Sequence, residues 1–364
     1  MRDVQPAVIG LGEEAPPAPA GEGTTGPGGP RARSRAAAAL GTRGAAATAA
    51  AIVAAAILPQ VTSDQYWLDV LSQAGLFVLL SAGLNVVVSL AGLLDLGYIA
   101  FWGIGAYTTA LLASGHYDIH LPMVALLPLS VVATSIFAIV IGFPTLRLRG
   151  DYLAVVTLGF GEIVRIALLN GGRITGGSAG IQDIDPPSVA GHAFGYLLEP
   201  YYYLVLVACM ITLLLGYLLR NSVLGIAWQA LRDDETAART CGLRPLHNYL
   251  LAFGIGAAFA GVSGTLFALK ETAVSPGSFT ADQSFLVLAI VVLGGARGLV
   301  STAALSALVV IVLPEALRSL HDYRMVVFGP ILVATIVVRA NWPFLRGAMA
   351  ESALARRWWR RSRS

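Results

Sequence analysis

Long apolar stretches recur along this chain from about residue 44 to residue 341, and polar or glycine-rich connections separate them. A helix that crosses a bilayer needs about 20 mainly apolar residues. Ten stretches meet or approach this length, so we expect about ten transmembrane helices, some of them broken or re-entrant. The expected segments are 44–61, 67–90, 93–114, 121–143, 151–170, 200–219, 246–269, 283–296, 299–318 and 324–341.

The eighth segment, 283–296, is short and is bounded by Gly294, Gly295 and Arg297. It is either a short crossing helix or a re-entrant segment. Non-helical backbone is tolerated at membrane depth only inside protein or beside water.

The composition agrees with a lipid environment. Hydrophobic residues make up 56% of the chain and charged residues only 12%, whereas soluble domains carry about 25% charge. A soluble surface of this size cannot be covered with so little charge. We therefore expect an all-α polytopic integral membrane protein, with a transmembrane domain over residues 45–341.

Both ends differ from this domain. Residues 1–44 are rich in Ala, Pro, Gly and Arg without apolar periodicity, which predicts a disordered tail. A secretory signal peptide is the competing interpretation, but it would place an apolar run near the start, and the first such run begins near Ala45. Residues 342–364 form a basic tail.

The arginines indicate an orientation. In a ten-helix arrangement most of them fall in alternate connections, on one side of the membrane, and the positive-inside rule makes that side cytoplasmic. Both termini and the connection 220–245 are then cytoplasmic, and the connection 171–199 is external. Connections of this length are usually functional. The arginine-bearing stretches are 31–43, 147–149, 220–244, 297 and 346–363.

The connection 220–245 predicts a helix over residues 224–241 that does not span the membrane. Ser222 can cap its start, and Gly242 is a suitable left-handed stop. A small apolar face could lie in the groove of a partner protein, or the helix could rest on the membrane surface; the pattern alone leaves both open. The apolar face carries Ala227, Leu231 and Ala238, and the charged run is Arg232, Asp233, Asp234 and Glu235.

Ionisable or amide side chains inside expected spans are costly and are candidates for function. Glu162 and Arg165 lie three residues apart and can pair with each other. Asp95 lies at a glycine-flanked break, and Asn85 lies in the second span. We favour structural pairing over substrate contact for all four candidate pathway residues.

Small residues recur at every fourth position of the seventh span. This spacing lets helix backbones approach closely in lipid, and we favour tight packing over substrate contact. The residues are Gly256, Ala260, Gly264 and Ala268.

Several kinds of chemistry lack their motifs. A phosphate-binding P-loop requires Gly-Lys followed by Ser or Thr, whereas Lys270 is the only lysine and precedes Glu271. The chain is therefore not the ATPase. No catalytic cluster is evident, and Cys209 and Cys241 have no metal-site spacing. Topology accounts for the arginines, so we expect no nucleic-acid surface.

Long blocks of the sequence resemble the LivM-type permease family of the high-affinity branched-chain amino acid ABC importers. They cover most of residues 66–340 and occur in the family's order. The blocks are GLNVVVSLAGLLDLGYIAFWGIGAYTTALLAS at 83–114, LRLRGDYLAVVTLGFGEIVRIALLN at 146–170, AWQALRDDETAARTCGL at 227–243 and VSPGSFTADQSFLVLAIVVLGG at 274–295.

The resemblance implies roles that the pattern left open. Glu235, Ala237, Ala238 and Gly242 look like the core of the cytoplasmic coupling loop by which such permeases dock on their ATPases; Arg232, Asp233 and Asp234 lie in the same loop. It also implies a second, LivH-like permease subunit, two ATPase subunits, an extracytoplasmic solute-binding protein and the bacterial inner membrane. The chain itself is expected to bind no cofactor or metal, because ATP and Mg are used by the ATPase partners.

The implied mechanism is alternating access, with leucine, isoleucine or valine as cargo. Two alternatives stay open at this point. The same machine could import urea or short amides, or the chain could be a secondary transporter driven by an ion gradient, since such proteins also contain broken helices and charged groups near the midplane.

Overall fold

The computed structural model describes residues 65–148, 150–189, 192–193 and 198–294. All described residues belong to one compact unit. Both expected tails and three expected spans, 44–61, 299–318 and 324–341, lie outside the described residues.

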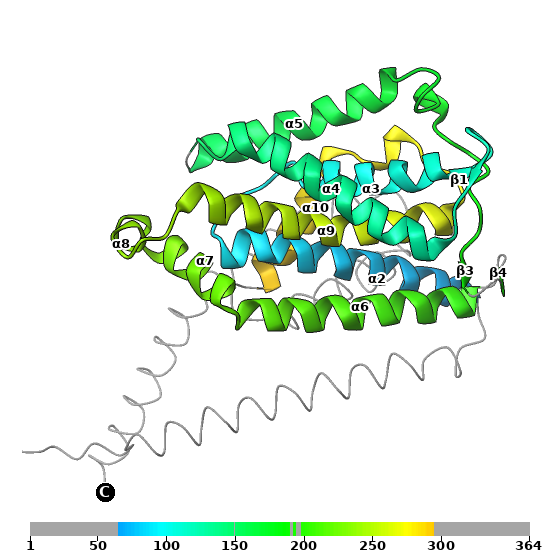
Figure 1. The fold of residues 1–364 in the computed structure, drawn as a ribbon. Helices are drawn as coiled ribbons and strands as arrows, with labels where there is room; N and C mark the ends of the chain where they lie inside the picture. The colour runs from blue at the N-terminus through cyan, green and yellow to red at the C-terminus, as the bar shows by residue number, and fades with distance from the viewer. Residues whose placement is uncertain (1–64, 149, 190–191, 194–197, 295–364) are drawn as a thin grey trace, which may run out of the picture. The chain divides into compact units, whose positions relative to one another are not determined.

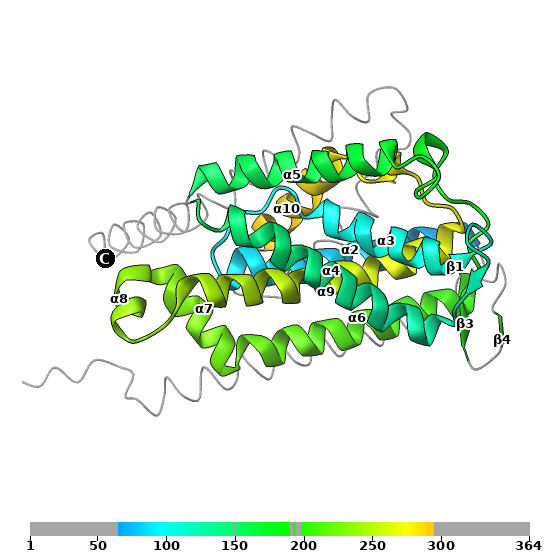
Figure 2. The same ribbon diagram turned by 45° about the horizontal axis from the view of Figure 1, so that its top comes forward.

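Within the described part, five helices are long and apolar enough to cross a membrane (Figures 1 and 2). At about 1.5 Å per residue, a helix of about 20 residues covers the hydrocarbon core. All five coincide with expected spans. They are α2 (Gln65–Asn85, continued by the π-helix η1, Val86–Leu90), α4 (Met123–Thr145), α5 (Asp151–Asn170), α6 (Leu198–Arg220) and α9 (Pro245–Glu271).

Two further expected spans are shorter helices. The predicted length of the span 93–114 was wrong, because only α3 (Ile99–Leu112) is helical there and residues 91–98 are not. Gly92 has a φ of +74°, a conformation that breaks a right-handed helix. The segment 283–296 corresponds to α10 (Ala281–Gly294), which is short, as its sequence predicted.

Helix α9 lies among the other membrane helices and packs against α2, α3 and α4. Its small residues make this possible, since Ala260 and Ala268 are completely buried. A Cβ added to Gly264 would lie 2.5 Å from the carbonyl oxygen of Trp102 on α3. The predicted tight packing of this face is confirmed.

We therefore expect Gly264→Ala to lower the midpoint of thermal unfolding of the purified protein in detergent. Forcing a methyl group into a packed core costs about 1–3 kcal/mol. Gly159→Ala is the matched control, because a Cβ at Gly159 meets no atom within 4 Å and alanine favours a helix over glycine by about 0.5–1 kcal/mol. Equal midpoints for the two variants would contradict this account.

The described part is mostly helical, as expected, and the connections at one end of the bundle add short strands of two residues each. The long connection 171–199 contains the short helix η2 (Gly177–Ala179) and is tied to neighbouring segments through bridges from Ile181 to Val274 and from Ile184 to Ser114. Both isoleucines are buried. The described part of this connection is therefore packed on the helices. The strands form two antiparallel pairs, β1 (Ala113–Ser114) with β2 (Ile119–His120), and β3 (Ser188–Val189) with β4 (His192–Ala193).

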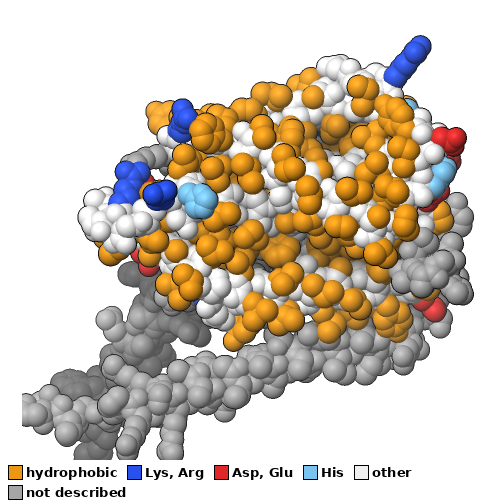
Figure 3. Space-filling model, in the orientation of Figure 1, with side chains coloured by type: hydrophobic (Ala, Val, Ile, Leu, Met, Phe, Trp, Pro, Cys, Tyr) orange, Lys and Arg blue, Asp and Glu red, His pale blue; other side chains and the backbone are white. Residues whose placement is uncertain are grey.

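The surface between the two ends of the helices is apolar. On the face drawn in Figure 3, hydrophobic side chains cover the middle, while basic and acidic side chains gather toward the ends. Exposed hydrophobic side chains on the membrane helices include Val124 and Val140 of α4 and Val155 of α5. A broad exposed apolar belt of this kind fits contact with lipid or with other membrane helices.

Candidate functional site

The segment 220–245 forms two helices, not the single helix expected over 224–241. They are α7 (Val223–Asp233) and α8 (Glu235–Thr240). Asp234 between them is extended, and its carboxylate accepts hydrogen bonds from the backbone N–H groups of Thr236 (2.8 Å) and Ala237 (3.0 Å). Aspartate is among the best N-cap residues and is less favourable inside a helix, so it starts a new helix here.

Both predicted boundaries of the segment are confirmed. The Ser222 hydroxyl accepts a hydrogen bond from the Gly225 N–H and caps α7. Gly242 has a φ of +87°. The Gly242 N–H donates to the Arg239 carbonyl, and the Leu243 N–H donates to the Ala238 carbonyl. This pair of bonds is a Schellman motif, in which glycine adopts the left-handed conformation at low cost.

The apolar face of the segment is already covered by this chain. Leu231 and Ala238 are buried, and so is Trp228, which packs with Val86 and Phe259. The expectation that this face is free to enter a partner's groove was therefore wrong. The sequence reasoning missed Trp228, although its spacing of three residues from Leu231 places both on one helix face.

The opposite side of the segment remains open. Glu235 forms an ion pair with Arg239, at 2.6 Å between Oε1 and Nη2. Ala237 is exposed, and so are both aspartates of the charged run. Any partner that docks here contacts charged and small residues. The exposed polar positions within 231–240 are Arg232, Asp233, Asp234, Thr236, Arg239 and Thr240.

A break in the helical backbone lies next to this segment. The chain leaves η1 at Leu90 and begins α3 at Ile99. Asp95 between them is buried, and its Oδ1 accepts a hydrogen bond from the Gly97 N–H at 2.9 Å. Its Oδ2 has no hydrogen-bond partner among the described residues. The predicted break at Asp95 is confirmed, and it lies inside protein.

The broken segment is held by two other helices. The Leu96 N–H donates to the Thr157 hydroxyl on α5 at 3.1 Å, and the Ser284 hydroxyl on α10 donates to the Leu96 carbonyl at 2.5 Å. These bonds satisfy backbone groups that would otherwise be unpaired at membrane depth. Asn85, the other candidate in this region, is buried at the end of α2.

Arg232 connects the two regions. Its Nη1 donates to the Ser89 carbonyl at the end of η1, and its aliphatic stem lies against Gly92. A cavity of about 590 Å³ lies beside this contact, between the segment 220–245, the broken helix and the turn before α5. Charged side chains on its wall are Arg147, Asp151, Arg232, Glu235 and Arg239.

The predicted pair on α5 is present. Arg165 Nε lies 3.0 Å from each carboxylate oxygen of Glu162. Both side chains are partly exposed on the described part of the molecule. Pairing partly neutralises the two charges within an apolar helix, which lowers the cost of placing them there.

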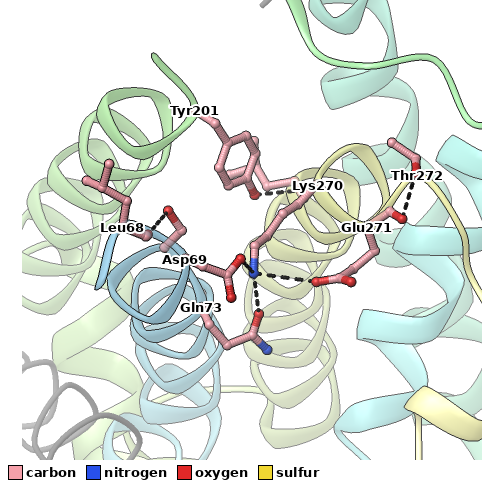
Figure 4. A network of polar contacts seen from close by, with 9 residues as sticks. Leu68, Asp69, Gln73, Tyr201, Lys270, Glu271 and Thr272 are labelled. Carbon is pink, nitrogen blue, oxygen red and sulfur yellow. Dashed lines mark hydrogen bonds and ion pairs between the residues drawn. The ribbon is translucent and has the colours of Figure 1, made fainter. Parts of the chain in front are cut away.

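One polar cluster was missed from the sequence (Figure 4). The Lys270 Nζ lies 2.9 Å from Asp69 Oδ1, 3.4 Å from Glu271 Oε1 and 3.3 Å from Gln73 Oε1. The Lys270 side chain is only 6% exposed, whereas that of Asp69 is 51% exposed. The lone lysine at the end of an apolar span is the signal in the sequence that points to this cluster.

This cluster joins α9 to α2, so we expect Lys270→Met to lower the free energy of unfolding by about 1–3 kcal/mol, the range for a charge-assisted bond. Asp151→Asn is the control, because Asp151 is an exposed acidic residue at the start of α5. Thermal unfolding in detergent measures both. An unchanged midpoint for Lys270→Met would mean that the cluster contributes nothing to helix packing.

Comparison with known proteins identifies the family. The family model for the branched-chain amino acid transport system / permease component matches residues 66–336. The high-affinity branched-chain amino acid permease protein LivM of Salmonella typhimurium is 44% identical over 293 residues, 74% of this chain and 68% of that protein. LivM of Escherichia coli K12 is 43% identical over the same shares.

More distant relatives share the same core. The autoinducer 2 import system permease LsrC of Escherichia coli is 25% identical over 251 residues, 67% of this chain and 69% of that protein. No solved structure matches the chain. The chain is an integral membrane protein and a transport component, and it belongs to the LivM-type family of branched-chain amino acid transport permeases.

Proposed function

We propose that this chain is the LivM-like subunit of an ABC importer that carries leucine, isoleucine and valine across the bacterial inner membrane. It forms the pathway with a LivH-like permease. Two ATPase subunits drive transport with ATP and Mg, and an extracytoplasmic binding protein delivers the cargo. The chain binds no cofactor of its own. The similarity to two LivM permeases over 74% of the chain supports this assignment.

The segment 220–245 is the proposed docking site for an ATPase. The observation that carries this role is its two-sided construction. Trp228 anchors one side to the membrane helices, and Leu231 is buried as well. On the other side, Asp233, Thr236 and Ala237 are exposed. A surface element anchored in this way can transmit a displacement by a partner to the membrane helices that it contacts.

The candidate pathway residues divide by burial. Asn85 and Asp95 are buried within this chain, and we assign them to packing and to the helix break. Glu162 and Arg165 are partly exposed on a membrane helix. A half-exposed ion pair is costly against lipid, so we place this face of α5 toward the pathway or the LivH-like subunit.

The decisive experiment reconstitutes the whole complex in proteoliposomes. Uptake of labelled leucine is then measured with the loaded binding protein added. Uptake is expected to require ATP and to stop when the ATPases are omitted. Uptake that survives without ATP but collapses with an uncoupler would replace the proposal with ion-coupled transport. Uptake of urea or short amides in place of leucine would change the assigned substrate and leave the assignment as an ABC importer intact.

A further inference from the structure

Arg232 stands apart from the other charged residues of the segment 220–245. The neighbouring Glu235 and Arg239 pair with each other within α8. Arg232 instead reaches out of its own helix, and its Nη1 donates to the Ser89 carbonyl of η1. Arg232 is exposed as a whole, yet its guanidinium bonds to the broken helix.

The bonding partner of Arg232 lies at a helix end. Carbonyl groups in the last turn of a helix lack intrahelical partners and carry partial negative charge. In η1 the Ala91 N–H donates to Val86 and the Leu93 N–H donates to Val87, and the Ser89 carbonyl accepts from Arg232. A guanidinium is well suited to this place, because it is permanently charged and its donors are rigidly arranged.

Gly92 makes the close approach possible. It has a φ of +74°, and a Cβ added to it would lie 2.6 Å from Cγ of Arg232 and 3.1 Å from its Cβ. Any other residue at position 92 would push the arginine stem away from the break. The glycine and the arginine therefore fit each other as a pair.

The contacts continue from the break to two membrane helices. The stretch that starts at Gly92 reaches Leu96, which bonds to Thr157 on α5 and to Ser284 on α10. Trp228 forms a second, apolar contact between α7 and η1. These contacts form a continuous path from α7 through Arg232 to the broken segment, and from there to α5 and α10.

We propose that Arg232, although exposed, is a positioning residue that couples the ATPase-docking segment to the helix break through its bond to Ser89, and that it does not itself hold the ATPase. This inference rests on the proposed function. Arg232 would hold α7 and the break together while the ATPases close, so that their movement reaches α5 and α10. Without it, the ATPases would still attach and hydrolyse ATP, but the movement would be lost at α7.

The test uses the full reconstituted complex with a loaded binding protein. ATPase co-purification, ATP hydrolysis and leucine uptake are measured on the same preparations. For Arg232→Gln we expect normal co-purification, ATP hydrolysis within about twofold of the parent, and about tenfold less leucine imported per ATP, in the range for losing a charge-assisted bond. Arg232→Lys keeps the charge without the planar guanidinium. Its leucine uptake per ATP should therefore lie between that of the parent and that of Arg232→Gln.

A double variant separates coupling from a general loss of structure. Gly92→Ala should also lower uptake per ATP. Its effect should be smaller in the Arg232→Ala background, because the side chain that it displaces is then shorter; interacting neighbours give such non-additive effects. If Arg232→Gln does not insert stably, the Arg232→Lys and Gly92→Ala variants carry the test.

Each other outcome has a defined meaning. Loss of ATPase co-purification in Arg232→Gln would place Arg232 in the docking surface and overturn the inference. Unchanged uptake per ATP, or additive effects of the Gly92 and Arg232 changes, would overturn it as well. If Gly242→Val abolishes uptake while Arg232→Gln does not, only the inference on Arg232 fails. If neither change alters uptake, the docking role of the whole segment fails.

Discussion

Gly242→Val is expected to abolish ATP-dependent leucine uptake while the chain still inserts into the membrane. Gly242 ends α8 with a φ of +87°, which a β-branched residue adopts only with strain of about 1–3 kcal/mol. A Cβ at Gly242 meets no atom within 4 Å, so the cost arises from the backbone and not from a clash. Relief of the strain would unwind the end of α8 and displace the docking surface.

Gly242→Asn is the matched control for this variant. Asparagine adopts the left-handed conformation more readily than other non-glycine residues, so uptake should be largely retained. ATPase co-purification and uptake are measured together. Normal uptake and normal co-purification in Gly242→Val would show that the geometry at the end of α8 does not matter for coupling.

Glu235 belongs to the same test. Glu235→Lys places two like charges side by side, because Glu235 pairs with Arg239 in the parent protein. We expect weaker ATPase attachment and loss of uptake. The double variant Glu235→Lys with Arg239→Glu restores an ion pair in reversed order. Recovery of uptake would assign the effect to the pair itself, and continued loss would assign it to the charges that the partner meets.

The second large effect is an all-or-none difference in labelling from the two sides of the membrane. In a background without Cys209 and Cys241, a cysteine at Ser178 should react with an impermeant thiol reagent in intact cells, and one at Thr236 should not. Both positions are exposed in the structure, and the cells express the chain without its ATPases, so that no docked partner covers Thr236 and accessibility depends on the side of the membrane. The arginine distribution requires this orientation.

Permeabilised cells supply the control for this labelling, because Thr236→Cys should then react as well. Cysteines at Ser34 and Ser352 test the two termini in the same way and should behave like Thr236→Cys. Reaction of Thr236→Cys in intact cells would overturn the cytoplasmic placement of the segment 220–245, and with it the proposed docking of an ATPase there.

Apolar length and local capping were readable in the sequence. The five long spans follow from runs of apolar residues, and these runs are a local property. Ser222 and Gly242 mark the ends of the segment 220–245 because capping depends on a residue and its near neighbours in the chain. The Glu162–Arg165 pair was predictable for the same reason, since three residues bring two side chains to one helix face.

Contacts between distant residues were not readable. The break at Asp95 was predicted, but its length was not: residues 93–98 looked like part of a span because they are mainly apolar. The backbone bonds of Leu96 go to Thr157 and Ser284 on other helices. The interruption at Asp234 was missed because a single polar run fits one helix or two. The Lys270 cluster was missed because Asp69 lies about 200 positions away in the sequence.

The sequence by itself therefore determined the environment, the family and the position of the docking segment, since apolar run length, charge placement and long motif blocks are properties of neighbouring residues. Only the tertiary structure decided which face of that segment is free and where its charges point. Trp228 is buried because residues of η1 and α9 pack against it, and the Arg232 guanidinium bonds to a carbonyl at a helix end 143 positions earlier in the chain. Such partners are set by packing, which no local pattern encodes.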